Sequence, residues 1–325
     1  MTKPVSYSVA FQQGVREEME RNDRIFVLGT DLYERGGHFA QVKGLGPEFG
    51  RDKVRDAPIS EAAMVAAGVG AALSGARPIV DLNFDDFGYG AMDEISNQAA
   101  KARYMWGQKV PLVIRATSGV ALGGAQHNNS MEMLLASIPG LAVVSPSTSG
   151  DVKGLIKSAL RAEDPVLFLM HKKLTGVRGA VGGKDDLIPL GSANLVRNGD
   201  DVTIIGYSNG VTTALASADA LAERGVGADV IDLRSIYPLD LATLTSSVRR
   251  TGRVVIVDEA PIFGSVAAQL SALIQRDAFW YLDAPIKLVT APQSPIPHSP
   301  SLIDALIPGV DDVVRAVDSV MEERP

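Results

Sequence analysis

The sequence predicts an α/β protein of two domains, each a mostly parallel sheet covered by helices on both faces. Its 325 residues are enough for two ordinary hydrophobic cores. In both halves, short continuous apolar runs alternate with helix-like segments, which is typical of buried parallel strands. A stretch rich in glycine and charge at residues 175–189 separates the halves and is expected to be a linker. We therefore expect domains at residues 1–180 and 190–325.

The first half is expected to alternate strands with helices. Its predicted strands cover residues 24–28, 78–82, 111–115, 141–145 and 165–170, and its predicted helices cover 60–75, 92–104 and 150–161. Ser60 is expected to cap the first of these helices, with Glu61 in its first turn and Gly75 at its end. Residues 31–50 form a long Gly-rich connection, and loops of that length are usually functional or mobile.

The second half repeats the alternation. Its predicted strands cover residues 202–207, 228–233, 254–258 and 286–290, and its predicted helices cover 211–224, 241–251, 265–275 and 310–322. No repeat of 20–50 residues is visible, so the pattern indicates two α/β domains and not a solenoid.

The composition limits the class of protein. With 46% hydrophobic residues, 21% charged residues and a formal net charge of −7, the chain resembles a globular protein without a nucleic-acid-binding stripe. It has no cysteine, which excludes disulfides, thiolate metal sites and a cysteine nucleophile. The longest run of small apolar residues, 62–73, is shorter than the roughly 20 residues that span a bilayer. We expect a cytoplasmic protein that is not inserted in a membrane.

Glu61 is the first candidate for chemistry. It begins a helix lined with alanine and glycine, so another backbone or a flat ligand can approach closely. A carboxyl group in such an apolar slot can hold or share a proton. The alternative is an ordinary acidic residue, stabilised by the positive end of a helix.

His127 is the second candidate, in the sequence GGAQHNNS. A Gly-rich turn after a strand of a parallel sheet is where ligands bind in such folds, and imidazole side chains transfer protons near neutral pH. The alternative is a polar loop residue. Phe87, in NFDDFGYG, could stack on a flat heterocycle or simply fill the core.

Several common signatures are missing. The sequence has no GxxxxGK[ST] loop, no GxGxxG that opens a helix after a strand, and no GxSxG elbow. No group of His, Asp and Glu has metal-ligand spacing, so the sequence assigns no metal ligand.

The chain nevertheless resembles one family over nearly its whole length: the β subunit of the thiamine-diphosphate-dependent decarboxylating component of 2-oxo acid dehydrogenase complexes, in the transketolase superfamily. The acetoin dehydrogenase branch is the most similar. The resembling blocks include PISEAAMVAAGVGAALSGARPIVDL, DFGYGAMDEISNQAAKARYM, GGAQHNNS, DVIDLRSIYPLD, VVIVDEAP and VTAPQSPIPHSPSLIDALIP.

The resemblance implies a pyrimidine-binding domain followed by a transketolase C-terminal-like domain. Glu61 would bind the pyrimidine ring of thiamine diphosphate and activate the cofactor, and Phe87 would stack on that ring. His127 would face the thiazolium and the substrate, acting in proton transfer or acyl transfer. His298 departs from the family pattern, since an aromatic residue usually follows Ile-Pro there.

The resemblance also implies a partner. The family signature for the diphosphate and Mg²⁺ begins with Gly-Asp-Gly, and it is absent here, because Gly199-Asp200-Asp201 lacks the second glycine. An α subunit should therefore complete the cofactor site, in a heterotetramer of two α and two β chains. The resemblance also allows a K⁺ ion near the turn at residues 162–165 and a lipoyl acyltransferase core as a further partner.

The expected reaction is cleavage of a C–C bond next to a carbonyl, in a 2-oxo acid or an acyloin, with transfer of the acyl group to a lipoyl carrier. One alternative is a split transketolase or carboligase that gives its carbanion to an aldehyde. Its substrates carry phosphate, and Arg115 and Lys172 are the candidates to bind it. A second alternative is a β-like chain with a purely structural or regulatory role.

Overall fold

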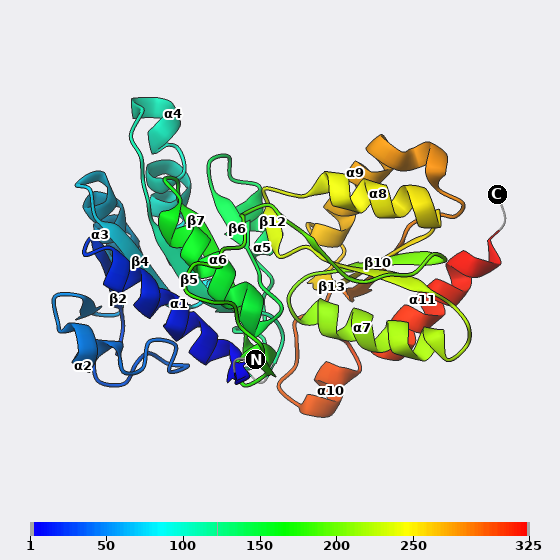
Figure 1. The fold of residues 1–325 in the computed structure, drawn as a ribbon, viewed down its shortest axis with the longest axis horizontal. Coiled ribbons are helices and arrows are strands. Elements are labelled where there is room, and N and C mark those ends of the chain that lie inside the picture. Colours follow the sequence, from blue (N-terminus) through cyan, green and yellow to red (C-terminus); the bar gives the residue numbers. More distant parts are fainter. Residues whose placement is uncertain (1–2, 122, 324–325) are drawn as a thin grey trace. The chain divides into compact units, whose positions relative to one another are not determined.

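The computed structural model describes residues 3–121 and 123–323, which form two compact units (Figure 1). The first unit comprises residues up to 118 together with 134–190, and the second comprises 119–133 together with 191 onward. Both are α/β units, which confirms the predicted fold class. Residues 119–133, which include His127, belong to the second unit although they lie inside the first half of the sequence.

The first unit contains a parallel sheet with the strand order β6-β7-β5-β4-β2-β3. Its strands are β2 (Ile25–Gly29), β3 (Val54–Asp56), β4 (Arg77–Phe84), β5 (Val113–Ser118), β6 (Ala142–Val144) and β7 (Val166–His171). All point the same way, so their carboxyl ends share one edge of the sheet, and ligands usually bind at that edge.

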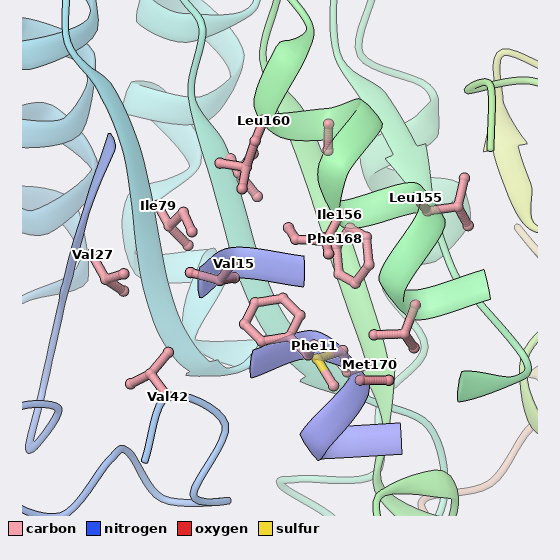
Figure 2. Packing of buried hydrophobic residues seen from close by; sticks show 14 of the residues in the cluster. Phe11, Val15, Val27, Val42, Ile79, Leu155, Ile156, Leu160, Phe168 and Met170 are labelled. Carbon is pink, nitrogen blue, oxygen red and sulfur yellow. The ribbon is translucent and has the colours of Figure 1, made fainter. Parts of the chain in front are cut away.

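Helices cover the two faces of this sheet differently. On one face, α1 (Tyr7–Arg21) packs against α6 (Ser149–Arg161), and both bury apolar side chains on the strands (Figure 2). On the other face, α3 (Glu61–Leu73) contacts β4. Ile79 of β4 joins the α1 and α6 core, whereas Val80 lies beneath α3, because neighbouring strand residues point to opposite faces.

Two features of the first unit differ from the prediction. In place of the helix expected at 92–104, the structure has a π-helical segment η2 (Glu94–Ala99) and a short helix α4 (Ala102–Trp106), and a 3₁₀ segment η1 (Asp85–Ala91) precedes them. The expected linker is partly ordered, since β8 (Arg178–Gly179) pairs antiparallel with β1 (Val5–Ser6). Helix α1 was also not predicted, although its buried residues recur at helical spacing.

The second unit contains a sheet with the order β14-β13-β10-β11-β9. Strands β10 (Val202–Gly206), β11 (Ala228–Asp232), β13 (Val254–Pro261) and β14 (Lys287–Ala291) are parallel, and β9 (Asn194–Arg197) is antiparallel at the edge. Helices α7 (Asn209–Ala222) and α11 (Val310–Glu322) form a core with one face. Helices α8 (Leu241–Thr251) and α9 (Val266–Ala278) pack together and contact β10 and β13, respectively.

The remaining elements are short. They are α2 (Leu45–Phe49), α5 (Glu132–Ala136), η3 (Lys172–Leu174), β12 (Ser235–Tyr237), η4 (Phe279–Tyr281) and α10 (Pro300–Asp304). In the part of the chain that the structure describes, no helix has the length and apolar character needed to cross a bilayer.

Candidate functional site

Glu61 is the first residue of α3 and is partly buried. Ser60 occupies the N-cap position, as predicted, but its side chain makes no capping hydrogen bond. The carboxylate therefore lies where the first N–H groups of a helix have no intrahelical acceptor, a setting that favours negative charge.

Helix α3 presents two very different faces. Met64, Val65 and Val69 are buried, and Gly68 packs so closely on the sheet that a Cβ there would lie 2.5 Å from Val80 Cγ2. The opposite face exposes alanines and a glycine, namely Ala63, Ala66, Ala67 and Gly70. Glu61 precedes Met64 and Val65 by three and four residues, so it begins the side of the helix that faces the sheet, and the alanine face lies on the opposite side.

Phe87 lies in η1, which follows β4 and packs against α3. Its half-buried ring meets the Phe84 ring edge-on, with centroids 5.8 Å apart. Phe84 in turn contacts the rings of Phe39 at 5.4 Å and His38 at 5.6 Å. Glu61 and Phe87 thus come from two packed elements of one unit, and Phe87 is held by an aromatic cluster that fixes its orientation.

A buried acid next to Phe87 was missed by the sequence analysis. Asp85 is 2% exposed, and one of its oxygens, Oδ1, accepts the Asp86 N–H at 2.9 Å. Burial raises the pKa of Asp85 to about 7; the charge of Asp86 adds to this effect and that of Lys172 opposes it. Lys172 Nζ lies 5.6 Å from the centre of the Phe84 ring. The only signal in the sequence was an Asp-Asp pair directly after an apolar strand.

Arg115, a candidate phosphate ligand in the transketolase alternative, is fully buried in β5. Its guanidinium lies 3.2 Å from the Asp81 carboxylate and donates to the Thr117 hydroxyl at 2.7 Å. Gln41 also donates to Asp81, at 2.7 Å. Arg115 is therefore part of a buried polar network, and its charge is already balanced inside the protein.

His127 lies in the second unit, in a partly buried loop. The neighbouring Asn128 is buried and bridges the loop. Its oxygen accepts the Ala121 N–H at 2.9 Å, and its amide donates to the Gly124 carbonyl at 2.9 Å. Gly124 has φ +67°, and a Cβ there would lie 3.7 Å from His298 Nδ1. The glycine thus permits a backbone turn that brings the loop close to a second imidazole.

No group of three or more His, Asp or Glu side chains within residues 3–121 and 123–323 could hold a metal ion. The three predicted site residues are divided between the units. Glu61 and Phe87 lie in the first unit, on α3 and η1, which pack against each other, and His127 lies in the second unit.

Comparison with known proteins identifies the family to which this chain belongs. Residues 3–177 match the model of the transketolase pyrimidine binding domain, and residues 191–313 match that of the transketolase C-terminal domain. A solved structure of a split-gene transketolase, as an inactive β4 tetramer, aligns with a TM-score of 0.83 over 99% of this chain and all of that one. Its 23% sequence identity shows the shared fold alone.

Curated relatives match over almost their full length. The chain is 42% identical to the β subunit of acetoin:2,6-dichlorophenolindophenol oxidoreductase from Cupriavidus necator, covering 99% of each. It is 40% identical to the 2-oxoisovalerate dehydrogenase β subunit of Bacillus subtilis, covering 98% of this chain and 99% of that one. It is 38% identical to the pyruvate dehydrogenase E1 β subunit of Rickettsia bellii, covering 96% and 97%. The chain therefore belongs to the β subunits of the 2-oxo acid and acetoin dehydrogenases, a thiamine-diphosphate-dependent family built from transketolase domains.

Proposed function

We propose that this chain is the β subunit of a heteromeric enzyme that cleaves the C–C bond next to the carbonyl of a 2-oxo acid or an acyloin and passes the acyl group to a lipoyl carrier. The observation that carries this proposal is the placement of Glu61 and Phe87 on packed elements of a pyrimidine-binding unit. The similarity to acetoin and 2-oxo acid dehydrogenase β subunits supports the substrate class.

Glu61 and Phe87 fit the pyrimidine ring of thiamine diphosphate. Glu61 lies partly buried at the N-terminal end of α3, and Phe87 offers an oriented ring for stacking from η1, which packs against α3. In this role Glu61 holds a hydrogen bond to a ring nitrogen and keeps a proton available there. When bound, the cofactor supplies the nucleophilic carbon that attacks the substrate carbonyl.

His127 has a different role in this proposal. Its imidazole transfers a proton to or from the substrate, or assists transfer of the acyl group to the lipoyl arm. The bridging Asn128 supports this role, because it restricts the loop that carries the imidazole.

The chain holds only part of a cofactor site. We propose that an α subunit supplies the ligands for the diphosphate and Mg²⁺, in a heterotetramer of two α and two β chains that docks on a lipoyl acyltransferase core. A K⁺ ion near residues 162–165 would use mainly backbone carbonyls. The carbonyl of Ala162 already accepts a hydrogen bond from Arg77, which leaves fewer oxygens for such an ion.

The split transketolase alternative has less support. Arg115 is balanced by Asp81, and Lys172 is largely buried beside Asp85, so neither offers an exposed charge to a phosphate group. The likeness to a split-gene transketolase extends to the fold alone. A purely structural role does not require the Glu61, Phe87 and His127 combination.

The proposal is tested by co-expressing this chain with the product of the neighbouring gene, as the candidate α subunit. Pyruvate, 2-oxoisovalerate and acetoin are then supplied with thiamine diphosphate, Mg²⁺ and 2,6-dichlorophenolindophenol as the electron acceptor. Dye reduction with at least one substrate, dependent on both chains, is the expected result. Formation of a ketose from an aldehyde acceptor without dye reduction would instead support the carboligase alternative.

A further inference from the structure

The loop that carries His127 is anchored at both ends to the second unit. Residues 119–133 leave β5 at Ser118 and end inside α5, yet their contacts place them with residues 191–325. A loop position held from both ends has less conformational freedom, and the side chains that hold it become part of the machinery that positions His127.

The first anchor is Glu259, near the end of β13. Its Oε2 accepts the backbone N–H of Val120 at 2.9 Å, and its Oε1 accepts the side-chain amide of Asn209, the first residue of α7, at 2.7 Å. The Val120 side chain is buried in an apolar cluster of the same unit, formed with Ala291, Ile296, Ile303 and Ile307. The Glu259 carboxylate thus links Val120, at the N-terminal end of the loop, to both β13 and α7.

The second anchor is Glu132, at the start of α5. It is 3% exposed and lies near the buried Tyr207, where its negative charge adds to the burial that raises the pKa of the phenol. The Tyr207 hydroxyl donates to Asp258 at 2.8 Å. Asp258 also accepts the N–H groups of Ala260 and Ala267. Glu132, at the C-terminal end of the loop, therefore lies near a polar network that includes residues of β13 and α9.

A short path joins the first anchor to His127. Glu259 holds the N–H of Val120, and the next N–H in the chain, that of Ala121, is held by the side chain of Asn128. Asn128 is the residue directly after His127. Displacement of Val120 would therefore move the Ala121–Asn128 bridge, and with it the backbone that carries the imidazole.

We propose that Glu259 and Asn209 form a positioning pair that sets the location of His127 through Val120 and the Ala121–Asn128 bridge. This inference rests on the proposed function of His127. Neither residue of the pair contacts substrate in this scheme. Their effect is on the geometry of the loop, and displacement of a reacting group by about 1 Å can cost roughly 100-fold in rate.

The test uses an exchange of hydrogen-bonding groups in the assembled enzyme with its α subunit. In Glu259→Gln, one of the two acceptor oxygens becomes an NH₂ group, so either Val120 or Asn209 loses its acceptor. In the double variant Asn209→Asp with Glu259→Gln, the new amide can donate to the new carboxylate, and the remaining oxygen can still accept from Val120. An aspartate is also favourable at the first position of a helix.

We expect Glu259→Gln to lower kcat by about tenfold to 100-fold, with the Kd for thiamine diphosphate unchanged. Backbone amide exchange over residues 119–133 should become faster. The double variant should recover most of the activity and the slow exchange. In a His127→Ala background, Glu259→Gln should lower kcat no further, because the two changes act through one group.

Any of three results would overturn the inference. Glu259→Gln could keep the wild-type kcat and the wild-type amide exchange rates, or the double variant could fail to recover them. Glu259→Gln could also lower kcat as much in the His127→Ala background as it does in the wild type. Failure of the proposed function looks different, since the unmodified assembly would then show no cofactor-dependent turnover of pyruvate, 2-oxoisovalerate or acetoin. Amide exchange would in that case still report whether Glu259 holds the loop.

Discussion

At the scale of single residues, Glu61 is the side chain on which the proposed chemistry depends most. Glu61→Ala removes the carboxylate from the first turn of α3 and leaves the buried face of the helix unchanged. We expect activity of the assembled enzyme to fall by at least about 100-fold, the usual loss for a general acid or base. The free energy of unfolding should change by no more than about 1 kcal/mol, the contribution of a charge at a helix end.

The control for this variant is its neighbour. Ser60 makes no capping hydrogen bond, so Ser60→Ala should leave both stability and activity close to those of the wild type. Full activity in Glu61→Ala would show that another group activates the cofactor.

His127→Ala tests the second site residue. The loop is shaped by Asn128 and Gly124, so loss of the imidazole should leave it folded. We expect calorimetry to give an unchanged Kd for thiamine diphosphate in the assembly and steady-state kinetics to give a kcat lower by about 100-fold or more. An unchanged kcat would show that His127 is a polar loop residue without a role in turnover.

Asp85 should make stability depend on pH. Its pKa is about 7 in the folded chain and near 3.8 when unfolded, so the folded state retains the proton over that interval while the unfolded state releases it. The free energy of unfolding is therefore lowered by Asp85 in a pH-dependent way. This decrease is absent below about pH 4, grows as the pH rises towards 7, and is complete above that.

Asp85→Asn removes this titration. Urea unfolding should show the variant gaining stability relative to the wild type at pH 8 and little or none at pH 4. An equal difference at both pH values would contradict the raised pKa of Asp85.

At the scale of elements, two glycines of α3 are expected to respond in opposite ways to the same change. In Gly68→Ala the new Cβ would lie 2.5 Å from Val80 Cγ2 and 3.1 Å from Leu112 Cδ1, so the helix must shift from the sheet. We expect a loss of about 1–3 kcal/mol in the free energy of unfolding.

Gly70→Ala is the matched control. Gly70 lies on the exposed face of the same helix, and a Cβ there meets nothing within 4 Å. The isolated chain should gain up to about 1 kcal/mol, because alanine favours helices over glycine. Urea unfolding of both variants checks the assignment of the two faces, and equal effects would contradict it.

At the scale of the whole molecule, the proposed cofactor site requires a second chain. Glu61 and Phe87 are the residues proposed to bind the pyrimidine ring, and the sequence lacks the Gly-Asp-Gly signature for the diphosphate. Calorimetry should detect tight binding of thiamine diphosphate and Mg²⁺ by the co-expressed assembly and none by this chain alone. Tight binding by the isolated chain would mean that it holds a complete diphosphate site.

The amino-acid pattern alone was enough to predict the α/β class, most strands and the presence of Glu61, His127 and Phe87 in family blocks. These features depend on local pattern. A buried strand is a continuous apolar run, and α8 and α11 have the predicted bounds because their ends are marked by local signals such as Asp240, Gly252 and Gly309. The interruption of the helix after Phe87 has no such marker, since a π-helical segment differs from an α-helix only in its hydrogen bonding.

Long-range packing, which the amino-acid pattern does not reveal, sets which distant residues contact one another. Three features illustrate this point. Asp85 is buried near Lys172, Arg115 forms an ion pair with Asp81, and the His127 loop is hydrogen-bonded to Glu259 through Val120. Each depends on elements that are separated along the chain. Such contacts depend on how strands and loops are brought together in space. Periodicity and spacing report the local environment of a residue, and they contain no information about a partner more than a hundred positions away.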